Sequence, residues 1–258
     1  MNQLYFIGAG PGDPQLLTLQ GANALAMATT VYVPTPYDQT FAEPLQGKTV
    51  LIPFDYDYAE LIEMIEQQLQ EVSVAFLIPG DLTFYSPFQG LIDHFAERSV
   101  VLAGVGVANA ASARLKKTLD LPSVTNRAMI VSPKTLGDSA DNPTLEQLAA
   151  PGVSLLIYMN NLPLEELVAK LRQGYGKDVP IALLHCLGLP GEAVIEGTLD
   201  TIVANCGGHD YFFLNEPSKK PALTLVIVGE TLQETVDGSW WDYRRETMWK
   251  QRKVAEGR

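Results

Sequence analysis

Residues 5–25, "YFIGAGPGDPQLLTLQGANAL", decide how the N-terminal part of the chain folds. An apolar run is followed at once by a glycine-spaced turn, and the turn by a segment with the apolar residues of a helix. A strand, a tight turn and a helix in this order form one βα unit of a parallel sheet. Nucleotide-binding proteins hold phosphates at such turns, so the turn raises the question of which ligand it serves.

The turn matches the dinucleotide-binding pattern only in part. Gly8 and Gly10 fit the pattern G-x-G-x-x-G, but Asp13 occupies the position of the third glycine. A carboxylate there repels a phosphate, whereas Asp13 followed by Pro14 makes a favourable helix cap and first helical residue. The second predicted strand, residues 29–34, also ends without an acidic residue for a ribose hydroxyl. A nicotinamide-dependent oxidoreductase therefore remains only as a general alternative.

The rest of the chain alternates short apolar runs with segments of helical period, which predicts an α/β fold with mainly parallel sheets. We expect a first α/β domain over residues 1–118, a second over residues 119–240, and a basic, aromatic C-terminal tail over residues 241–258. Strands are expected at residues 3–8, 29–34, 47–53, 73–78, 99–104, 126–133, 153–159, 180–187 and 222–229, with a hairpin-like segment at 191–199. Helices are expected at residues 13–28, 59–70, 86–97, 108–119 and 162–174.

A second turn of interest lies in "VAFLIPGDLTFYSPF", residues 74–88. A buried strand ends at Gly80 and Asp81, two aromatic residues follow, and Ser86 opens a helix. The carboxyl edge of a parallel sheet is where such folds bind ligands, and a glycine there lets a ligand approach the main chain. Taken alone, the motif is equally compatible with a plain tight turn.

Together the two motifs are specific. Gly8-Ala9-Gly10-Pro11-Gly12-Asp13, with Gly80-Asp81-x-x-x-Tyr85-Ser86 some distance downstream, resembles the tetrapyrrole methylase family. These are S-adenosylmethionine-dependent enzymes that methylate uroporphyrinogen III and the precorrins. The resemblance continues in order through "GVGVANAASARLKKTLDLPSV", "LLIYMNNLPLEELVAKL", "GKDVPIALLHCLGLPGEAVIEGTL" and "ALTLVIVG", and so covers almost the whole chain.

The resemblance implies a ligand cleft between the two domains, in which main-chain groups and small apolar side chains hold S-adenosylmethionine, or S-adenosylhomocysteine as product. A sulfonium cofactor carries no phosphates, so an adenine slot and a few main-chain bonds suffice. The matching cofactor-binding positions are Pro11, Gly80, Asp81, Phe84, Gly106, Val107, Met159, Leu187, Ala222, Leu223 and Thr224. The chemistry implied is displacement at an already activated methyl group, so the protein mainly orients the reactants and excludes water. The sequence identifies no catalytic residue, and His185 is interpreted as a packed residue.

The expected substrate is a small tetrapyrrole intermediate of cobalamin biosynthesis. The C-terminal half is most similar to the precorrin-4 methylases acting at carbon 11, whereas residues 74–88 look closer to the precorrin-2 methylases. The family's usual residues are replaced at Leu82 and Ala103, and Pro34 stands where uroporphyrinogen methylases have an acidic residue, with Asp38 four positions on. A catalytically silent member therefore stays open. The acidic substrate needs basic partners, for which Arg114, Lys116, Lys117 and Arg127 are the candidates, with Asp38 as a further substrate-binding residue.

Composition limits the other functions. The chain has 258 residues and a formal net charge of −12, which argues against a nucleic-acid partner. The sequence shows no secretion signal and no membrane segment, so we expect a cytoplasmic enzyme and, from the family, a homodimer. Cys186 and Cys206 lack metal-ligand spacing, so they are expected to be reduced, packed thiols with no metal site. Six of the 18 basic residues fall in the last 15 positions among tryptophans, which indicates a solvated tail, a lid or a dimer arm.

Overall fold

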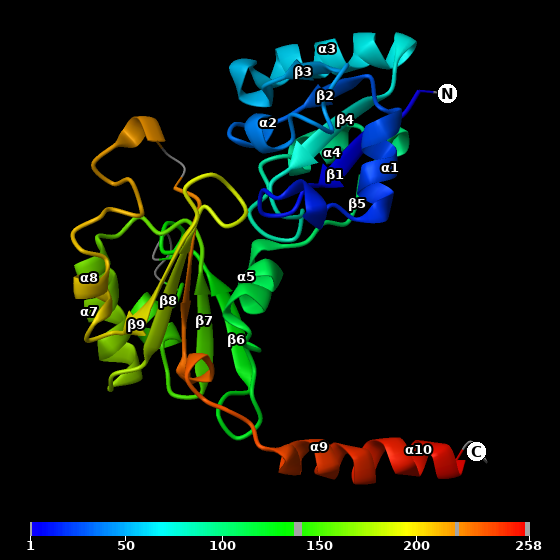
Figure 1. The fold of residues 1–258 in the computed structure, drawn as a ribbon. Helices are drawn as coiled ribbons and strands as arrows, with labels where there is room; N and C mark the ends of the chain where they lie inside the picture. The colour runs from blue at the N-terminus through cyan, green and yellow to red at the C-terminus, as the bar shows by residue number, and fades with distance from the viewer. Residues whose placement is uncertain (1, 137–140, 220–221, 256–258) are drawn as a thin grey trace.

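The computed structural model describes residues 2–136, 141–219 and 222–255. It contains two five-stranded sheets with helices packed against them, one built by the N-terminal part of the chain and one by the C-terminal part (Figure 1). The strand orders are β3-β2-β4-β1-β5 in the first sheet and β6-β7-β10-β8-β9 in the second. The expected α/β fold with two sheets is therefore confirmed, while the limits of the domains stay a prediction.

The first sheet is entirely parallel. Its strands are β1 (Leu4–Gly8), β2 (Thr30–Tyr32), β3 (Thr49–Leu51), β4 (Val74–Ile78) and β5 (Ser99–Leu102). The central strand β4 is buried along its whole length, as expected for a parallel sheet that helices cover on both faces. Because β1, β4 and β5 run in the same direction, the loops that follow them leave the same edge of the sheet.

Alternate residues of these strands face two separate cores. Ile7, Ala75 and Leu77 pack on one face with α1 (Leu19–Met27) and α2 (Tyr37–Thr40). Phe6, Phe76 and Ile78 pack on the other with α3 (Tyr58–Glu71) and α4 (Gln89–His94). Helix α3 buries Leu61, Ile65 and Leu69, and Asp57 caps it by accepting a hydrogen bond from the Glu60 amide.

The first helix begins later than the sequence predicts. Asp13 does cap a turn through the Gln15 amide, but this turn is the short 3₁₀ helix η1 (Pro14–Leu16). Helix α1 starts at Leu19 and has its own cap, since Thr18 Oγ1 accepts a hydrogen bond from the Gly21 amide at 3.0 Å. The expected helix over 13–28 is thus two helical pieces, each with its own cap.

The second sheet is mixed rather than mainly parallel. Strands β6 (Arg127–Val131) and β7 (Val153–Ile157) are parallel, but β10 (Thr224–Val228) inserts antiparallel between β7 and β8 (Pro180–His185). The hairpin-like segment expected at 191–199 is the edge strand β9 (Ala193–Thr198), which pairs antiparallel with β8. Hydrophobic pattern alone does not encode strand direction, and the last strand along the chain enters the middle of this sheet.

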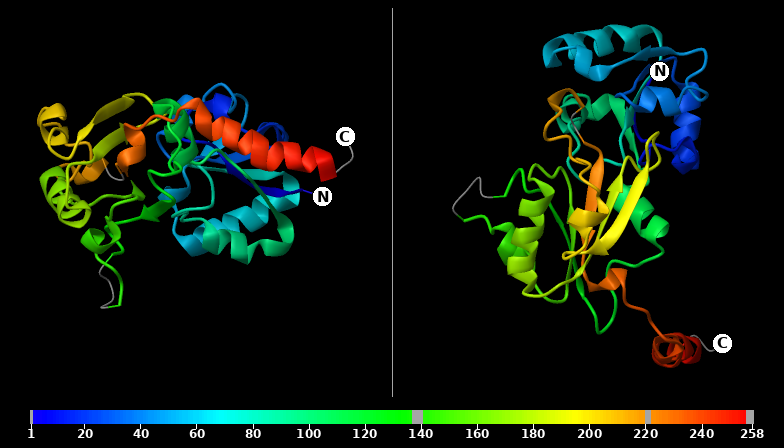
Figure 2. Two further views of the ribbon diagram at one scale, coloured as in Figure 1. Left: turned by 90° about the horizontal axis from the view of Figure 1, so that it is seen from below. Right: turned by 60° about the vertical axis from the view of Figure 1, so that its left-hand side comes forward.

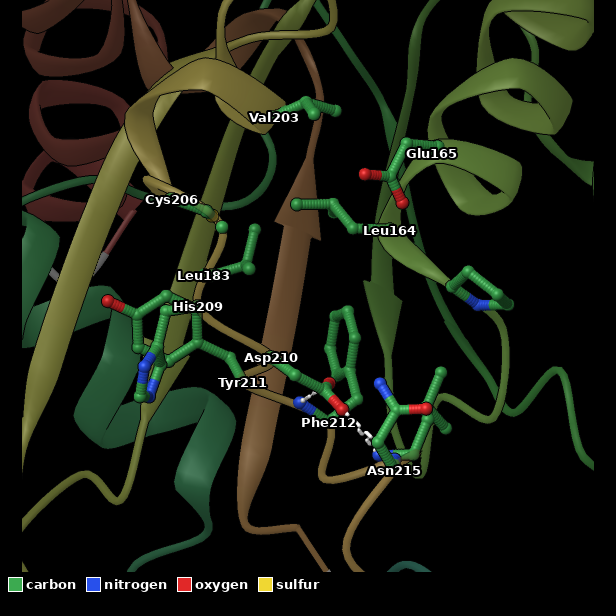
Figure 3. A pocket seen from close by; sticks show the side chains of 13 residues that line it. Leu164, Glu165, Leu183, Val203, Cys206, His209, Asp210, Tyr211, Phe212 and Asn215 are labelled. Atoms are coloured by element: carbon green, nitrogen blue, oxygen red, sulfur yellow. Dashed lines mark hydrogen bonds between the residues drawn. The ribbon is translucent and has the colours of Figure 1, made fainter.

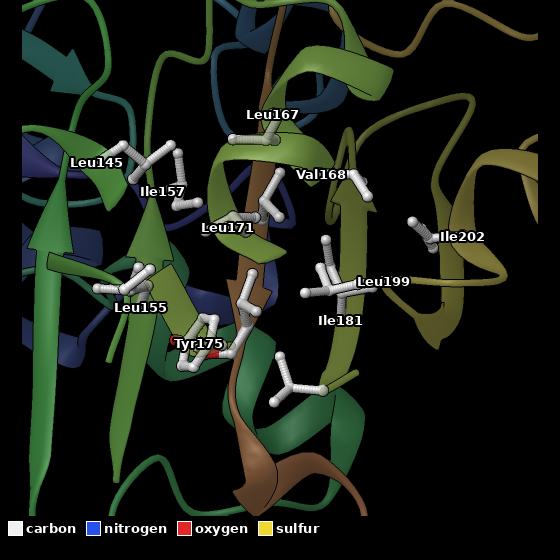
Figure 4. Close-up of a cluster of buried hydrophobic side chains, with 14 of the residues drawn as sticks. Leu145, Leu155, Ile157, Leu167, Val168, Leu171, Tyr175, Ile181, Leu199 and Ile202 are labelled. Carbon is white, nitrogen blue, oxygen red and sulfur yellow. Dashed lines mark hydrogen bonds between the residues drawn. The ribbon is translucent and has the colours of Figure 1, made fainter. Parts of the chain in front are cut away.

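Helices also cover both faces of the second sheet. Leu155, Ile157, Ile181 and other residues form a core with α6 (Leu145–Leu148), α7 (Leu164–Tyr175) and α8 (Ile202–Asn205), part of which Figure 4 shows. Residues of the opposite face, including Leu156, Leu184 and Ile227, pack with α5 (Val107–Leu115). Helix α5 therefore packs on the second sheet, although its place in the sequence predicts that it belongs to the first domain.

The chain ends in a continuous helical segment that projects from the second sheet (Figures 1 and 2). It consists of α9 (Gly238–Arg244), the π-helical turn η6 (Arg245–Trp249) and α10 (Lys250–Ala255). The connection from η5 (Glu230–Leu232) contains an irregular stretch at residues 234–237. The expected basic, aromatic tail is thus helical over its described part, and residues 256–258 lie outside the described residues. None of the described helices is long and apolar enough to cross a membrane.

Candidate functional site

The candidate site lies where the two halves of the chain meet, which we call the junction. It is built by the loops after β1, β4 and β5, by the loops after β7 and β8, and by the residues before β10. In the second sheet the end of β8 lies beside the start of β10, because His185 pairs with Thr224. Leu189, Cys186 and Leu223 of this half pack against the core of the first sheet, which joins the two halves.

The first two loops are tied to each other by main-chain hydrogen bonds. The Gly10 amide donates to the Gly80 carbonyl at 3.0 Å, and the Gly80 amide donates to the Gly10 carbonyl at 2.7 Å. The Tyr37 hydroxyl also donates to the Gly10 carbonyl, at 3.0 Å. Burial raises the pKa of Tyr37, which keeps this donor protonated. The loops that the sequence singles out are therefore one rigid unit.

Two glycines of the junction are required by close packing. A Cβ atom on Gly8 would lie 2.5 Å from the Gly104 backbone, so the loops after β1 and β5 touch through their main chains. A Cβ atom on Gly12 would lie 2.4 Å from the Leu189 side chain, which belongs to the loop after β8. The glycines of the first loop thus allow close approach between protein segments, including one from the second half.

Asp81 lies at a corner of the junction beside the start of α5. Its Oδ1 accepts a hydrogen bond from the Thr83 amide at 3.0 Å, which closes a tight turn. Its Oδ2 would lie 3.0 Å from a Cβ atom placed on Gly106, the residue before α5. Gly80 has a positive φ of +68°, and a Cβ atom there would lie 3.7 Å from the Val107 amide nitrogen. These four residues are therefore neighbours, as the sequence predicts.

Aromatic side chains from both halves meet at this corner. The Tyr158 ring, after β7, lies 5.6 Å from the Tyr85 ring and 6.3 Å from the Phe84 ring. Burial, with the Asp81 carboxylate and Tyr85 acting in the same direction, raises the pKa of Tyr158 to about 12, although a hydrogen bond with the Ala108 backbone opposes the shift. Phe84 and Met159 remain 44% and 37% exposed, so the corner presents apolar surface.

Backbone strain gathers at the same place. Six non-glycine residues among those described have a positive φ, and Tyr85, Met159 and Cys186 belong to the junction. Such conformations are costly and tend to concentrate at functional sites. The left-handed backbone of Tyr85 and Cys186 has no signal in the sequence, because it cannot be read from residue type at a tyrosine or cysteine.

His185 links the two segments of the second half that enter the junction. Its Nδ1 lies 2.7 Å from Thr224 Oγ1, and Thr224 Oγ1 donates to the Tyr211 carbonyl at 2.6 Å. The imidazole must therefore donate from Nδ1, which leaves Nε2 to accept from the Cys186 thiol at 3.3 Å. Burial, with a smaller effect of His209, lowers the pKa of His185. The interpretation of His185 as a packed residue is confirmed, since it is buried and fully engaged.

The expected basic residues Arg114 and Lys117 have different neighbours, since Arg114 lies on α5 and Lys117 follows its end. Arg114 Nε lies 3.1 Å from Glu192 Oε1, and Glu192 Oε2 accepts from the Gly188 amide at 2.9 Å. A Cβ atom on Gly188 would lie 2.9 Å from the Asp13 amide nitrogen, so Arg114 adjoins the junction through Glu192. Lys117 instead donates to the Glu234 carbonyl at 2.8 Å, after the C-terminal end of α5.

Lys117 and Arg127 lie away from the junction, so their role as substrate contacts stays a prediction that the structure does not support. Lys117 follows the end of α5 that is opposite to Gly106, and Arg127 pairs with Val153 at the start of β7, whereas Met159 follows the other end of that strand. In the sequence these residues lie near the predicted boundary between the two domains. In the structure that part of the chain lies away from the junction. Lys116 adopts the left-handed conformation that ends α5.

Asp38 lies in α2, next to Tyr37. Its Oδ1 is buried and has no hydrogen-bond partner among the described residues. A buried carboxylate oxygen without a donor is costly, so a ligand that carries an N–H or O–H group would relieve it. Asp38 thus remains a substrate-binding candidate.

The remaining predicted cofactor residues also fall at the junction. Pro11 is buried between Gly10 and Gly12, and Leu187 is buried against the α5 face of the second sheet. Leu223 accepts a hydrogen bond from the Cys186 amide at 2.8 Å, and it follows Ala222 directly. The structure therefore brings the predicted cofactor residues together, although it does not test their role. Sequence reasoning missed Tyr37, Tyr158 and Cys186.

The residues present fit a sulfonium cofactor better than a dinucleotide. The Asp13 carboxylate occupies the start of η1, where a phosphate would otherwise bind. The junction offers exposed apolar side chains, a bare main chain at Gly80 and one carboxylate, Asp81, whose Oδ2 adjoins them. Adenine needs an apolar slot, and an amino-acid group needs main-chain partners. No group of three potential metal ligands occurs among the described residues.

A separate hollow lies on the α7 face of the second sheet (Figure 3). Its lining includes Leu164, Glu165, His209 and Asn215. The Asp210 carboxylate there accepts hydrogen bonds from the amides of Phe212, Leu214 and Asn215, as the dashed lines in Figure 3 indicate. This carboxylate therefore holds a loop, and the hollow contains none of the predicted cofactor residues.

Comparison with known proteins bears directly on the junction. Residues 3–203 match the family described as Tetrapyrrole (Corrin/Porphyrin) Methylases. A precorrin-4 C(11)-methyltransferase of Pseudomonas aeruginosa is 27% identical over 234 residues, which cover 89% of this chain and 90% of that protein. A solved cobalt precorrin-4 methyltransferase superposes with a TM-score of 0.72 at 19% identity, covering 90% of this chain and 96% of that one.

A further solved structure contains the product of the cofactor. It is a uroporphyrin-III C-methyltransferase of Thermus thermophilus in complex with S-adenosylhomocysteine. It superposes with a TM-score of 0.63 at 21% identity, covering 90% of this chain and 94% of that chain. These structures have the fold observed here.

Proposed function

Because the chain belongs to the tetrapyrrole (corrin/porphyrin) methylase family, we propose that it methylates carbon 11 of precorrin-4 or cobalt-precorrin-4. Membership makes the chain a methyltransferase that uses S-adenosylmethionine and acts on a tetrapyrrole. The observation that supports the finer substrate is the 27% identity to a precorrin-4 C(11)-methyltransferase over 89% of this chain. The solved cobalt precorrin-4 methyltransferase, which superposes over 90% of this chain, agrees with it.

We place the cofactor in a cleft at the junction. The main chain at Gly80 and Gly106, together with the start of α5 at Val107, would hold the amino-acid part. Apolar side chains at Phe84, Met159 and Leu187 would enclose the adenine. The remaining proposed contacts are those with Pro11, Asp81, Ala222, Leu223 and Thr224. The positive φ of Gly80 and the absence of a side chain keep this main chain accessible.

The residues around the cofactor mainly orient it and exclude water. S-adenosylmethionine supplies an activated methyl group on a sulfonium, so no further activation by the protein is needed. The Tyr158 hydroxyl stays protonated at neutral pH because its pKa is about 12, so it can act as a hydrogen-bond donor at the corner of Asp81 and Tyr85. The hydrogen-bonded chain from Cys186 through His185 to Thr224 fixes the two segments of the second half. Reaction rates respond strongly to such positioning.

We propose that Asp38 and Arg114 contact the substrate. The partnerless Asp38 Oδ1 can accept a pyrrole N–H and is the proposed proton acceptor once the new carbon–carbon bond has formed. Arg114 is a basic side chain that adjoins the junction, and its partner Glu192 is also bonded to Gly188. A carboxylate of the substrate can replace Glu192 on Arg114.

The substrate is tested with S-adenosylmethionine labelled with carbon-13 in its methyl group. Precorrin-4, precorrin-2 and uroporphyrinogen III are each incubated with the enzyme, and the labelled ring carbon is assigned by NMR. We expect label on carbon 11 of precorrin-4 and little transfer to the other two rings. Label at another carbon, or on another ring, would contradict the proposed substrate and identify the true one. Cofactor binding without transfer to any ring would make the chain a silent member of the family.

We also propose that the enzyme works in the cytoplasm, where S-adenosylmethionine is made, and that it forms a homodimer. Both points extend what is common in the family. A calorimetric titration with NAD serves as the control for the oxidoreductase alternative, and no heat of binding is expected, since Asp13 closes the phosphate position.

A further inference from the structure

The C-terminal helical segment, residues 238–255, presents large apolar side chains to solvent. Trp241 is 69% exposed and Trp249 is 57% exposed, and Trp240, Tyr243 and Met248 are exposed as well. At 1.5 Å per residue the segment is roughly 27 Å long. Soluble proteins rarely leave so much contiguous apolar surface without a partner. Residues 204–258 lie beyond the part of the chain that the family model matches.

The segment has two faces of different chemistry. Arg244 lies over the Trp240 ring at 4.9 Å and donates to Met248 Sδ at 3.4 Å, and Arg252 lies over the Trp249 ring at 5.5 Å. We call these five residues the arginine–aromatic face. A second row pairs Lys250 with Glu246 and Arg245 with Asp242 and Glu246. The second row satisfies its own charges, whereas the arginine–aromatic face has the composition of a protein interface.

Charge indicates which partner this face fits. Residues 238–258 carry six basic and three acidic side chains, whereas residues 1–237 carry 12 basic and 27 acidic side chains. The segment is thus positive and the rest of the same chain strongly negative. A second copy of this chain therefore offers electrostatic complementarity that a random partner would not.

The most acidic part of the surface is around α3. Nine acidic and no basic residues occur between Lys48 and Arg98. Glu60, Glu63 and Glu71 are exposed on α3, opposite the buried Leu61, Ile65 and Leu69. Two exposed aromatic side chains lie at the start of this helix and just before it, namely Tyr58 at 53% and Phe54 at 64%. We call Phe54, Tyr58, Glu60, Glu63 and Glu71 the α3 patch.

The C-terminal segment and α3 lie at opposite ends of the molecule (Figure 1). The two views of Figure 2 likewise show the segment projecting from the second sheet. The arginine–aromatic face cannot reach the α3 patch of its own chain without large rearrangement, so a contact between the two requires a second copy. If each copy binds the α3 patch of the other, the two identical contacts form a closed dimer with two-fold symmetry.

We propose that the arginine–aromatic face docks on the α3 patch of a second copy, and that two such contacts hold the homodimer together. The inference rests on the proposed dimer and is independent of methyl transfer. Arginine stacked on tryptophan supplies apolar area and positive charge together, and the patch supplies exposed aromatics and carboxylates.

Sedimentation of the full chain and of charge-reversed variants tests the proposal. Arg244→Glu with Arg252→Glu should weaken the dimer by roughly tenfold or more, because like charges then face each other. Glu60→Lys with Glu63→Lys should do the same, and a chain with all four changes should regain the dimer. Lys250→Glu on the second row and Glu196→Lys on β9 are the controls, because they reverse a charge outside the two proposed surfaces. Both should leave the dimer intact.

Replacing the tryptophans tests the apolar contribution to the dimer contact separately from the contribution of charge. Trp240→Ala with Trp249→Ala removes both tryptophans of the arginine–aromatic face and should make the chain monomeric. Leu19→Ala, which removes an exposed apolar side chain on α1, should not. Variants are compared only if their melting temperature and S-adenosylhomocysteine affinity equal those of the wild type, so failure of the dimer is distinguished from failure of the proposed function.

Three results would overturn the proposal. One is a wild-type chain that sediments as a monomer at tens of micromolar. Another is a dimer that survives both charge reversals. The third is a monomer that co-sediments with phosphatidylserine vesicles through the same tryptophans, which would assign the face to a membrane surface.

Discussion

Arg114 and Lys117 are three residues apart but differ in what they can reach. Arg114 pairs with Glu192 beside the junction, whereas Lys117 is bonded to the Glu234 carbonyl beyond the end of α5. We expect Arg114→Glu to raise KM for a precorrin substrate by about tenfold, the loss of one charge-assisted contact worth about 1.4 kcal/mol. The affinity for S-adenosylhomocysteine should change little, because its proposed contacts are main-chain and apolar.

Lys117→Glu is the matched control for this prediction, since it makes the same charge change three residues away, just after the end of α5. Steady-state kinetics on both variants, with calorimetry for the cofactor product, gives the comparison. Equal effects of the two substitutions on KM would show that Arg114 acts only through overall charge.

His185 makes stability depend on pH. Burial lowers its pKa below the ordinary value of 6.5, so the unfolded chain binds the proton more readily than the folded chain. The stability contributed by the neutral imidazole is therefore complete above about pH 6.5 and is lost as the pH falls below this value. Thermal unfolding between pH 8 and pH 5 should show this loss, and His185→Gln should reduce its slope.

His94→Gln is the control, because His94 is an exposed histidine of the first half. An unchanged slope in His185→Gln would mean that other groups cause the acid sensitivity. Any change in KM for S-adenosylmethionine in His185→Gln would come from the loss of the bond to Thr224, since the imidazole positions the segments without touching the reacting atoms.

At the scale of elements, the loop after β1 contains two helix caps rather than one. Asp13 caps η1 and Thr18 caps α1. Thr18→Ala should lower the free energy of unfolding by about 1 kcal/mol, because the Gly21 amide then loses its acceptor. Asp13→Ala should cost a similar amount, whereas Asp13→Asn should keep most of the stability and of the cofactor affinity.

Chemical denaturation of these three variants, with calorimetry for S-adenosylhomocysteine, checks the assignment. If Asp13→Asn loses cofactor binding while its stability is unchanged, the carboxylate contacts the ligand directly. In that case Asp13 would be a binding residue in addition to a cap.

The elements also show what the sequence can and cannot predict. Strands β1, β4, β7, β8 and β10 are continuous apolar runs, so their positions follow from pattern. The insertion of β10 between β7 and β8 and its antiparallel direction depend on pairing across the whole second half, which no local pattern encodes. The packing of α5 on the second sheet was missed for the same reason.

The same distinction applies to the candidate site. Gly80 and Asp81 were predicted because a glycine turn directly after a buried strand is recognisable in sequence, and Gly106 because of the resemblance to the family. Tyr37 and Tyr158 were missed, since the Tyr37 bond to Gly10 and the Tyr158 contact with Tyr85 join segments far apart in sequence. An aromatic residue next to Met159 was the only available signal for Tyr158.

At the scale of the whole molecule, function depends on two halves that meet through their loops. Leu189 of the second half is buried in the first core, and the Gly12 backbone leaves room for it. The proposed cofactor contacts come from both halves, so binding should stabilise the folded chain by mass action. Melting curves with increasing S-adenosylhomocysteine should rise in midpoint, whereas NAD at the same concentrations should leave the midpoint unchanged.

The most direct test of the junction as the cofactor site is a calorimetric titration of S-adenosylhomocysteine into Gly80→Val and Gly176→Val. Both glycines have a nearly identical positive φ, +68° and +67°, so the two substitutions impose similar backbone strain. Gly80 lies beside Val107 at the junction, whereas Gly176 ends α7 with nothing within 4 Å of its Cβ position. We expect one site per chain in the wild type and in Gly176→Val, and no measurable binding in folded Gly80→Val. Unchanged binding in Gly80→Val would contradict the placement of the cofactor at the junction.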